Sequence, residues 1–252
     1  PLARTAAECQ TLIEQADTRG LVLMVGHTFI FNHQVRLIRD LIERGELGDV
    51  MYINARRLNL GLFQKDINVA WDLAPHDLSM ILYWLQEDPV AINCQGKAHL
   101  NPNVEDVTTI TLTFANGCVA FIQSSWIDPK KTREITVVGT KKMVVFDDTQ
   151  PLEKIRIYDK RVELPPHYDT FAEFHYSYHY GDVLIPYSRQ VEPLRAECEH
   201  FIECVSEGTE SMTSGREGLR VVRLLDGAAQ SLRRNGALVN LSETALKVGS
   251  GK

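Results

Sequence analysis

The sequence predicts an α/β (α+β) protein: a short helix–strand unit, then one large, open, mostly antiparallel mixed sheet with helices on one face. Three observations carry this prediction. The first 26 residues show a helical pattern followed by a short, entirely apolar run. Six segments rich in Val, Ile, Thr and Phe then follow one another over residues 90–159, with tight-turn signals between them. Two amphipathic helical patterns close the chain.

The N-terminal unit opens with a capping box, in which Thr5 is followed three residues later by Glu8. The predicted helix ends at Gly20, and residues 21–25 (LVLMV) have the pattern of a strand buried on both faces of a parallel sheet. Such a strand needs neighbours that no earlier residue supplies. We therefore expect the natural protein to begin upstream, with residues 1–27 as the end of one domain and 28–252 as a second, α+β domain.

The remaining elements follow from periodicity and turn chemistry. Residues 34–44 carry one apolar helical stripe, and a second helix is predicted in 68–85, opening near Asp72. Asn116-Gly117 is the strongest hairpin signal, and short strands joined by tight turns pair antiparallel. The apolar helix 216–234 is expected to pack back on the N-terminal unit. The uncovered sheet face then predicts a homodimer or homotetramer.

Composition excludes several classes of protein. The net charge of −6 disfavours binding to nucleic acid or to an anionic membrane. No apolar run approaches the roughly 20 residues that span a bilayer, and the N-terminus has no signal-peptide pattern. The 5 cysteines are scattered without CxxC spacing, which argues against a disulfide framework and against a metal site. We expect a cytoplasmic protein with free thiols.

The sharpest chemical feature is the segment Trp71-Asp72-Leu-Ala-Pro-His76-Asp. Asp72 and His76 are four residues apart at a predicted helix start, so they share one face. A carboxylate beside an imidazole orients it and raises its basicity, which suits proton removal from an alcohol. The alternative is structural: Asp is a common N-cap, and a helical His is often only a packed residue. Pro75 is compatible with the first helical turn.

His27 and Thr28 directly follow the apolar run. Ligands of open parallel sheets bind beyond the carboxyl ends of the strands, which predicts a ligand contact here, with a plain polar loop as the alternative.

Four further residues could contact a hydroxylated substrate. Tyr176 and Tyr180 belong to an aromatic segment that could stack on sugar rings or simply pack a loop. Lys65 and Asn68 precede the Asp72/His76 motif and could bond substrate hydroxyls, although a solvated loop is the simpler reading.

These motifs, taken in order, resemble the glucose–fructose oxidoreductase, inositol dehydrogenase and rhizopine-catabolism (Gfo/Idh/MocA) family. The family's Glu-Lys-Pro motif and following helix match PLARTAAE from Pro1, its strand–VG–helix unit matches VGHTFIFNHQVRLIRDL, and its DxxxH motif matches WDLAPHD. The C-terminal run from EPLRAECEHF to REGLRVVRLL fits as well. The resemblance spans essentially the whole chain.

The resemblance implies a Rossmann domain followed by an open-sheet domain, with a sugar, polyol or nucleotide-sugar substrate between them. His76 would take the hydroxyl proton as hydride passes to NAD or NADP, and Asp72 would orient the hydroxyl. The family's lysine would lie just before Pro1. The candidates for the cofactor side are Pro1, His27, Thr28 and Trp71.

The glycine-rich loop of a dinucleotide site, GxGxxG, does not occur in these 252 residues. We therefore expect this stretch by itself to be inactive, although its parent protein would be an enzyme. The rival reading is a non-catalytic sugar-binding or oligomerisation module.

Overall fold

The structure is a computed structural model that describes residues 1–163, 177–187 and 191–241. One nine-stranded sheet organises it, in the order β8-β7-β6-β5-β1-β4-β3-β2-β9. The strands are β1 (Val50–Leu60), β2 (Ala91–Lys97), β3 (Val107–Thr113), β4 (Val119–Ser125), β5 (Ile127–Gly139), β6 (Met143–Asp147), β7 (Ile155–Glu163), β8 (Ser177–Leu184) and β9 (Val239–Asn240). The helices are α1 (Ala6–Arg19), the 3₁₀ turn η1 (Thr28–Phe31), α2 (His33–Glu43), α3 (Val69–Leu85), α4 (Pro193–Glu207) and α5 (Gly215–Arg233).

The sheet is mixed because one pair of strands runs parallel. β1 pairs in parallel with β4, and every other neighbouring pair is antiparallel. The predicted hairpin at Asn116-Gly117 joins β3 and β4, and Gly117 has φ +88, a left-handed conformation that favours glycine. The predicted fold class, an open and mostly antiparallel mixed sheet, is confirmed.

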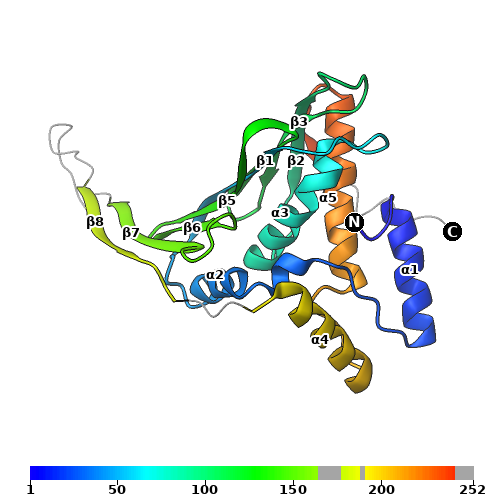
Figure 1. Cartoon of the computed structure of the whole chain (residues 1–252), viewed down its shortest axis with the longest axis horizontal. Coiled ribbons are helices and arrows are strands. Elements are labelled where there is room, and N and C mark those ends of the chain that lie inside the picture. The colour runs from blue at the N-terminus through cyan, green and yellow to red at the C-terminus, as the bar shows by residue number, and fades with distance from the viewer. Residues whose placement is uncertain (164–176, 188–190, 242–252) are drawn as a thin grey trace.

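The hydrophobic core lies between the sheet and the helices α2, α3 and α5, which gather on one side of it in Figure 1. Period-two alternation decides which strand residues enter this core. On β3, for example, Ile110 and Leu112 are fully buried, whereas the side chain of Thr109 points to the opposite face and is exposed. On β4 the inward residues are Ala120 and Ile122, so Phe121 points to the uncovered face.

A second, smaller core joins the N-terminal helix to α5, as Figure 1 shows from their side-by-side placement. It is formed by Cys9, Ile13, Leu219 and Val222. The Arg216 guanidinium also donates to Asp17 at 2.8 Å. Helix α5, which covers most of the predicted helix 216–234, therefore packs on α1.

The apolar run 21–25 differs from its prediction. It makes an isolated antiparallel bridge, Met24 with Ser214, in place of a strand of a parallel sheet. Val25 N donates to Thr213 O at 2.7 Å, and Gly215 N donates to Leu23 O at 3.0 Å. Within the described residues, the backbone partner of this run is the segment around Ser214, and the predicted pairing in a parallel sheet stays a prediction.

Helix α3 starts three residues earlier than predicted, at Val69, with Asn68 as its N-cap. Pro75 therefore lies inside the helix and not in its first turn. Because proline has no N–H, it cannot donate to the carbonyl of Trp71, one turn before it. In the described ranges, no helix has the length and apolar character needed to cross a membrane.

Candidate active site at the start of α3

The first turns of α3 position the Asp72/His76 pair. Asn68 accepts a hydrogen bond from Trp71 N at 3.1 Å and donates to Glu105 Oε2 at 2.8 Å, which fixes the helix start against the loop before β3. Asn68 is thus the cap, and the alternative that Asp72 serves as the N-cap is wrong. The capping role also engages the Asn68 amide, whose part in substrate binding stays a prediction.

Asp72 has a different partner from the one the motif suggests. Its Oδ2 accepts a hydrogen bond from Trp126 Nε1 at 2.9 Å, and Trp126 is fully buried at the junction of β4 and β5. A buried indole N–H needs a partner, so this bond both satisfies Trp126 and holds the carboxylate. Asp72 and His76 share a face of α3, but His76 is oriented by other groups.

His76 packs against the ring of Phe29 from η1, with ring centroids 5.4 Å apart and the planes inclined by 63°. Burial first, and then the Arg57 guanidinium, lower the pKa of His76 to about 4. The imidazole is therefore neutral at physiological pH. A neutral, partly accessible imidazole is the form that accepts a proton.

Sequence reasoning missed the pair Arg57–Asp77. Arg57 donates to both carboxylate oxygens of Asp77, at 3.0 and 2.8 Å, and both side chains are buried. The guanidinium also lies over the Phe29 ring, 4.8 Å from its centroid. A weak signal was present, because Asp77 directly follows His76 and Arg57 belongs to the strand-like run MYINARR; neither fact shows that the two residues meet.

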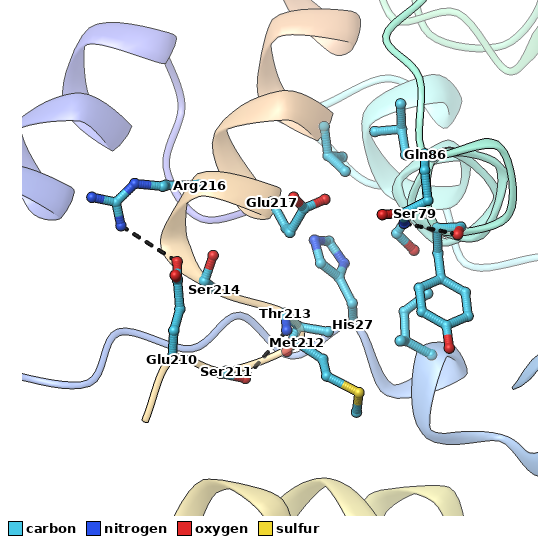
Figure 2. A pocket seen from close by; sticks show the side chains of 14 residues that line it. His27, Ser79, Gln86, Glu210, Ser211, Met212, Thr213, Ser214, Arg216 and Glu217 are labelled. Carbon is cyan, nitrogen blue, oxygen red and sulfur yellow. Dashed lines mark hydrogen bonds and ion pairs between the residues drawn. The ribbon is translucent and has the colours of Figure 1, made fainter. Parts of the chain in front are cut away.

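His27 lies on the other side of this region, at the end of the 21–25 run. It is 5% exposed, and its Nε2 has no hydrogen-bond partner. Burial, then the charge of the N-terminal amine, then His76 lower its pKa to about 4. Figure 2 shows its ring pointing into a cavity of about 510 Å³ between α3 and the start of α5. Thr213, another buried group without a hydroxyl partner, lines the same cavity.

The other cofactor-side candidates fall near the same region. The Thr28 hydroxyl donates to the buried Glu197 at 2.7 Å. The Pro1 amine lowers the pKa of both His27 and His76, which places the first residue within electrostatic reach of the two imidazoles. Trp71 packs against both hydrophobic cores. Their cofactor contacts stay predictions.

The substrate-side candidates that the structure describes lie on different elements. Lys65 is exposed in the loop before α3. Tyr180 is on β8, the sheet edge four strands from β1, where its ring stacks on Tyr178 at 6.4 Å. Tyr176 lies outside the described residues.

The metal and disulfide expectations concern the described ranges. There, no group of three or more His, Cys, Asp or Glu could hold a metal ion. The 5 cysteines are free, and only Cys198 is exposed.

Comparison with known proteins shows what the chain is similar to. Residues 35–145 match the family described as GFO/IDH/MocA C-terminal domain. The chain is 25% identical over 244 residues to the uncharacterized oxidoreductase YrbE of Bacillus subtilis (strain 168), covering 92% of this chain and 67% of that protein. It is 23% identical over 231 residues to inositol 2-dehydrogenase of Rhizobium meliloti (strain 1021), covering 86% of this chain and 64% of that protein. The chain thus spans about two thirds of the length of these relatives.

A solved structure shares the fold. It is an inositol dehydrogenase homolog from Azotobacter vinelandii, complexed with NADH and myo-inositol, with a TM-score of 0.73 and 16% identity. The match covers 94% of this chain and 69% of that one. Residues 35–145 thus resemble the C-terminal domain of Gfo/Idh/MocA proteins, and the chain is similar to named oxidoreductases over most of its length.

Proposed function

We propose that the protein is an NAD(P)-dependent dehydrogenase that acts on a hydroxyl-bearing carbon of a sugar, polyol or nucleotide sugar. The observation that carries this proposal is the start of α3, where a neutral His76 lies one turn from a carboxylate held by Trp126. The names of two similar proteins support this proposed class of substrate: one is an inositol 2-dehydrogenase, and the other is a UDP-N-acetylglucosamine 3-dehydrogenase.

The proton chemistry follows from these two side chains. The substrate O–H loses its proton to the neutral His76 imidazole, and the carbon–oxygen bond becomes a carbonyl as the C–H pair of electrons leaves. NAD(P), when bound, supplies the acceptor for that hydride. Asp72 has Oδ2 engaged by Trp126, and its Oδ1 can accept a hydrogen bond from a neighbouring hydroxyl of the substrate, which would position the reacting O–H toward His76.

The cofactor fits these residues only in part. A dinucleotide pyrophosphate is held by backbone amides of a glycine loop at a helix N-terminus, and GxGxxG does not occur in the printed sequence. We propose that residues 1–27 end a dinucleotide-binding domain whose loop lies upstream, while 28–252 form the substrate and assembly domain. His27, Thr28 and Trp71 would then lie on the nicotinamide side.

Calorimetry on two forms of the protein tests this proposal. The 252-residue chain should show no measurable NADH or NADPH binding, whereas a form extended by its natural upstream coding sequence should bind one of them and oxidise a polyol. Tight binding by the 252 residues would contradict the proposed division of the site. An extended form that binds sugar without turnover would favour the non-catalytic alternative.

We also propose self-association through the uncovered sheet face. Phe121 and Tyr52 point to that face from neighbouring strands and are 40% and 41% exposed. Apolar side chains gathered on such a face are typical of an interface. Sedimentation should give a dimer or tetramer, and Phe121→Glu should shift it toward monomer. A monomer at all concentrations would contradict this proposal.

A further inference from the structure

One group near the proposed base has no part in the function as stated so far. Arg57 is 6% exposed, and its partner Asp77 is 1% exposed. Taking two charges out of water costs more than their attraction usually returns, so a buried pair is weak evidence of stability alone. Its position therefore calls for another explanation.

That position is beside His76. The Arg57 guanidinium lies 4.8 Å from the centroid of the Phe29 ring, and the same ring contacts His76 at 5.4 Å between centroids. Three elements meet here, because Arg57 comes from β1, Phe29 from η1 and His76 from α3. The bidentate bond to Asp77 leaves the guanidinium little freedom to turn away.

We infer that Arg57, locked to Asp77 and laid against Phe29, is a positioning residue whose charge opposes protonation of the His76 imidazole, in addition to the burial of that ring. The inference rests on the proposed role of His76 as the base. A fixed positive charge nearby opposes a second positive charge on the imidazole, and burial between ring and strand limits screening by water.

The sign of this effect depends on all the charges that face His76. Arg57 and Arg133, from β1 and β5, oppose protonation, as does the Pro1 amine; Asp77 favours it. Arg57 has a larger effect on the pKa of His76 than Asp77 has, although Asp77 directly follows His76 in the sequence. Successive helical residues point ~100° apart, so the Asp77 carboxylate is directed at β1 and away from the imidazole.

NMR titration of the imidazole Cε1–H protons in the 252-residue chain tests the inference without substrate or cofactor. The His76 signal is assigned by its loss in His76→Gln. Replacing the pair by neutral groups, Arg57→Met with Asp77→Leu, should raise the pKa of His76, because Arg57 opposes protonation more than Asp77 favours it. A pKa of His76 that stays unchanged or falls in the folded double variant overturns the inference.

A single substitution should change the pKa of His76 in the opposite direction. Asp77→Asn keeps the size of the side chain and removes the charge that favours the imidazolium, so the pKa of His76 should fall. A rise in this variant overturns the inference even if the double variant fails to fold. The matched control is Arg56→Met, because Arg56 is the next residue on β1 and pairs with Glu134 at the surface; it should leave His76 unchanged.

Failure here and failure of the proposed function can be told apart. If the titrations behave as expected and an upstream-extended His76→Ala enzyme still turns over, the proposed function fails. If His76→Ala inactivates the enzyme and the Arg57 variants leave the pKa unmoved, only the role of Arg57 fails. Arg57→Lys adds a check, since it retains the charge and should keep the acid limb of the kcat/KM profile near that of wild type.

Discussion

The start of α3 and the β8 edge are both rich in groups that could bind a sugar, yet they differ in how those groups are held. Asp72 and His76 are fixed by Trp126, Phe29 and the Arg57 pair, which come from segments far apart in sequence. On β8, Tyr178 and Tyr180 stack on each other and are 61% and 75% exposed. Catalysis depends on groups held in place before the substrate arrives, so the helix start is the stronger candidate.

The largest effect should come from His76→Ala in the upstream-extended enzyme. Removing a positioned general base costs typically 10²–10⁴-fold in turnover. Steady-state kinetics at saturating cofactor measures the loss, and His33→Ala, an exposed histidine at the start of α2, is the matched control. Normal turnover by His76→Ala would leave the helix start with a structural role only.

Asp72→Asn should cause comparable damage while cofactor affinity stays nearly unchanged. Trp126→Phe is the subtler change, because it removes the N–H that holds Asp72 Oδ2 and leaves the carboxylate charged. A hydrogen bond to a charged group contributes about 1.5–3 kcal/mol, so a loss of at least tenfold in kcat is expected. Unaltered kcat in Trp126→Phe would show that Asp72 needs no such support.

Acid stability provides a third comparison. His76 and His27 have pKa values lowered to about 4 from 6.5, so the unfolded chain takes up protons that the folded chain refuses. Stability is then highest above pH 6.5 and falls as the pH drops toward 4. Between pH 7.5 and 5 each histidine should cost about 2 kcal/mol. Urea unfolding at both pH values should show a smaller loss in His76→Gln and in His27→Gln, and an equal loss would refute the burial of these imidazoles.

The smallest effect is expected at the β8 edge. If Tyr180 contributes one neutral hydrogen bond to substrate, Tyr180→Phe should raise KM by about threefold with kcat unchanged, since such a bond contributes about 0.5–1.5 kcal/mol. Tyr178→Phe is the matched control on the same strand. An unchanged KM would remove Tyr180 from the site and widen the difference between the two regions.

Local sequence patterns were enough to predict much of the secondary structure of this protein. Alternation and turn residues predicted the sheet between 90 and 159, Asn116-Gly117 predicted its tightest hairpin, and the Thr5/Glu8 capping box is present at α1. The spacing of Asp72 and His76 placed them on one helical face. Each of these features depends on residues a few positions apart, so it can be predicted from the sequence pattern.

Other features needed the tertiary structure. The spacing of WDLAPHD suggested that Asp72 holds His76, whereas Trp126 holds Asp72 and the ring of Phe29 contacts His76. The Arg57–Asp77 pair, the cap at Asn68 and the antiparallel bridge at Met24 were likewise not predicted. The sequence by itself determined the fold class and placed the two candidate catalytic side chains on one helical face, because periodicity and spacing are local. Only the tertiary structure decided their partners and the protonation state of His76, because burial and Coulomb interactions depend on distances between segments remote along the chain.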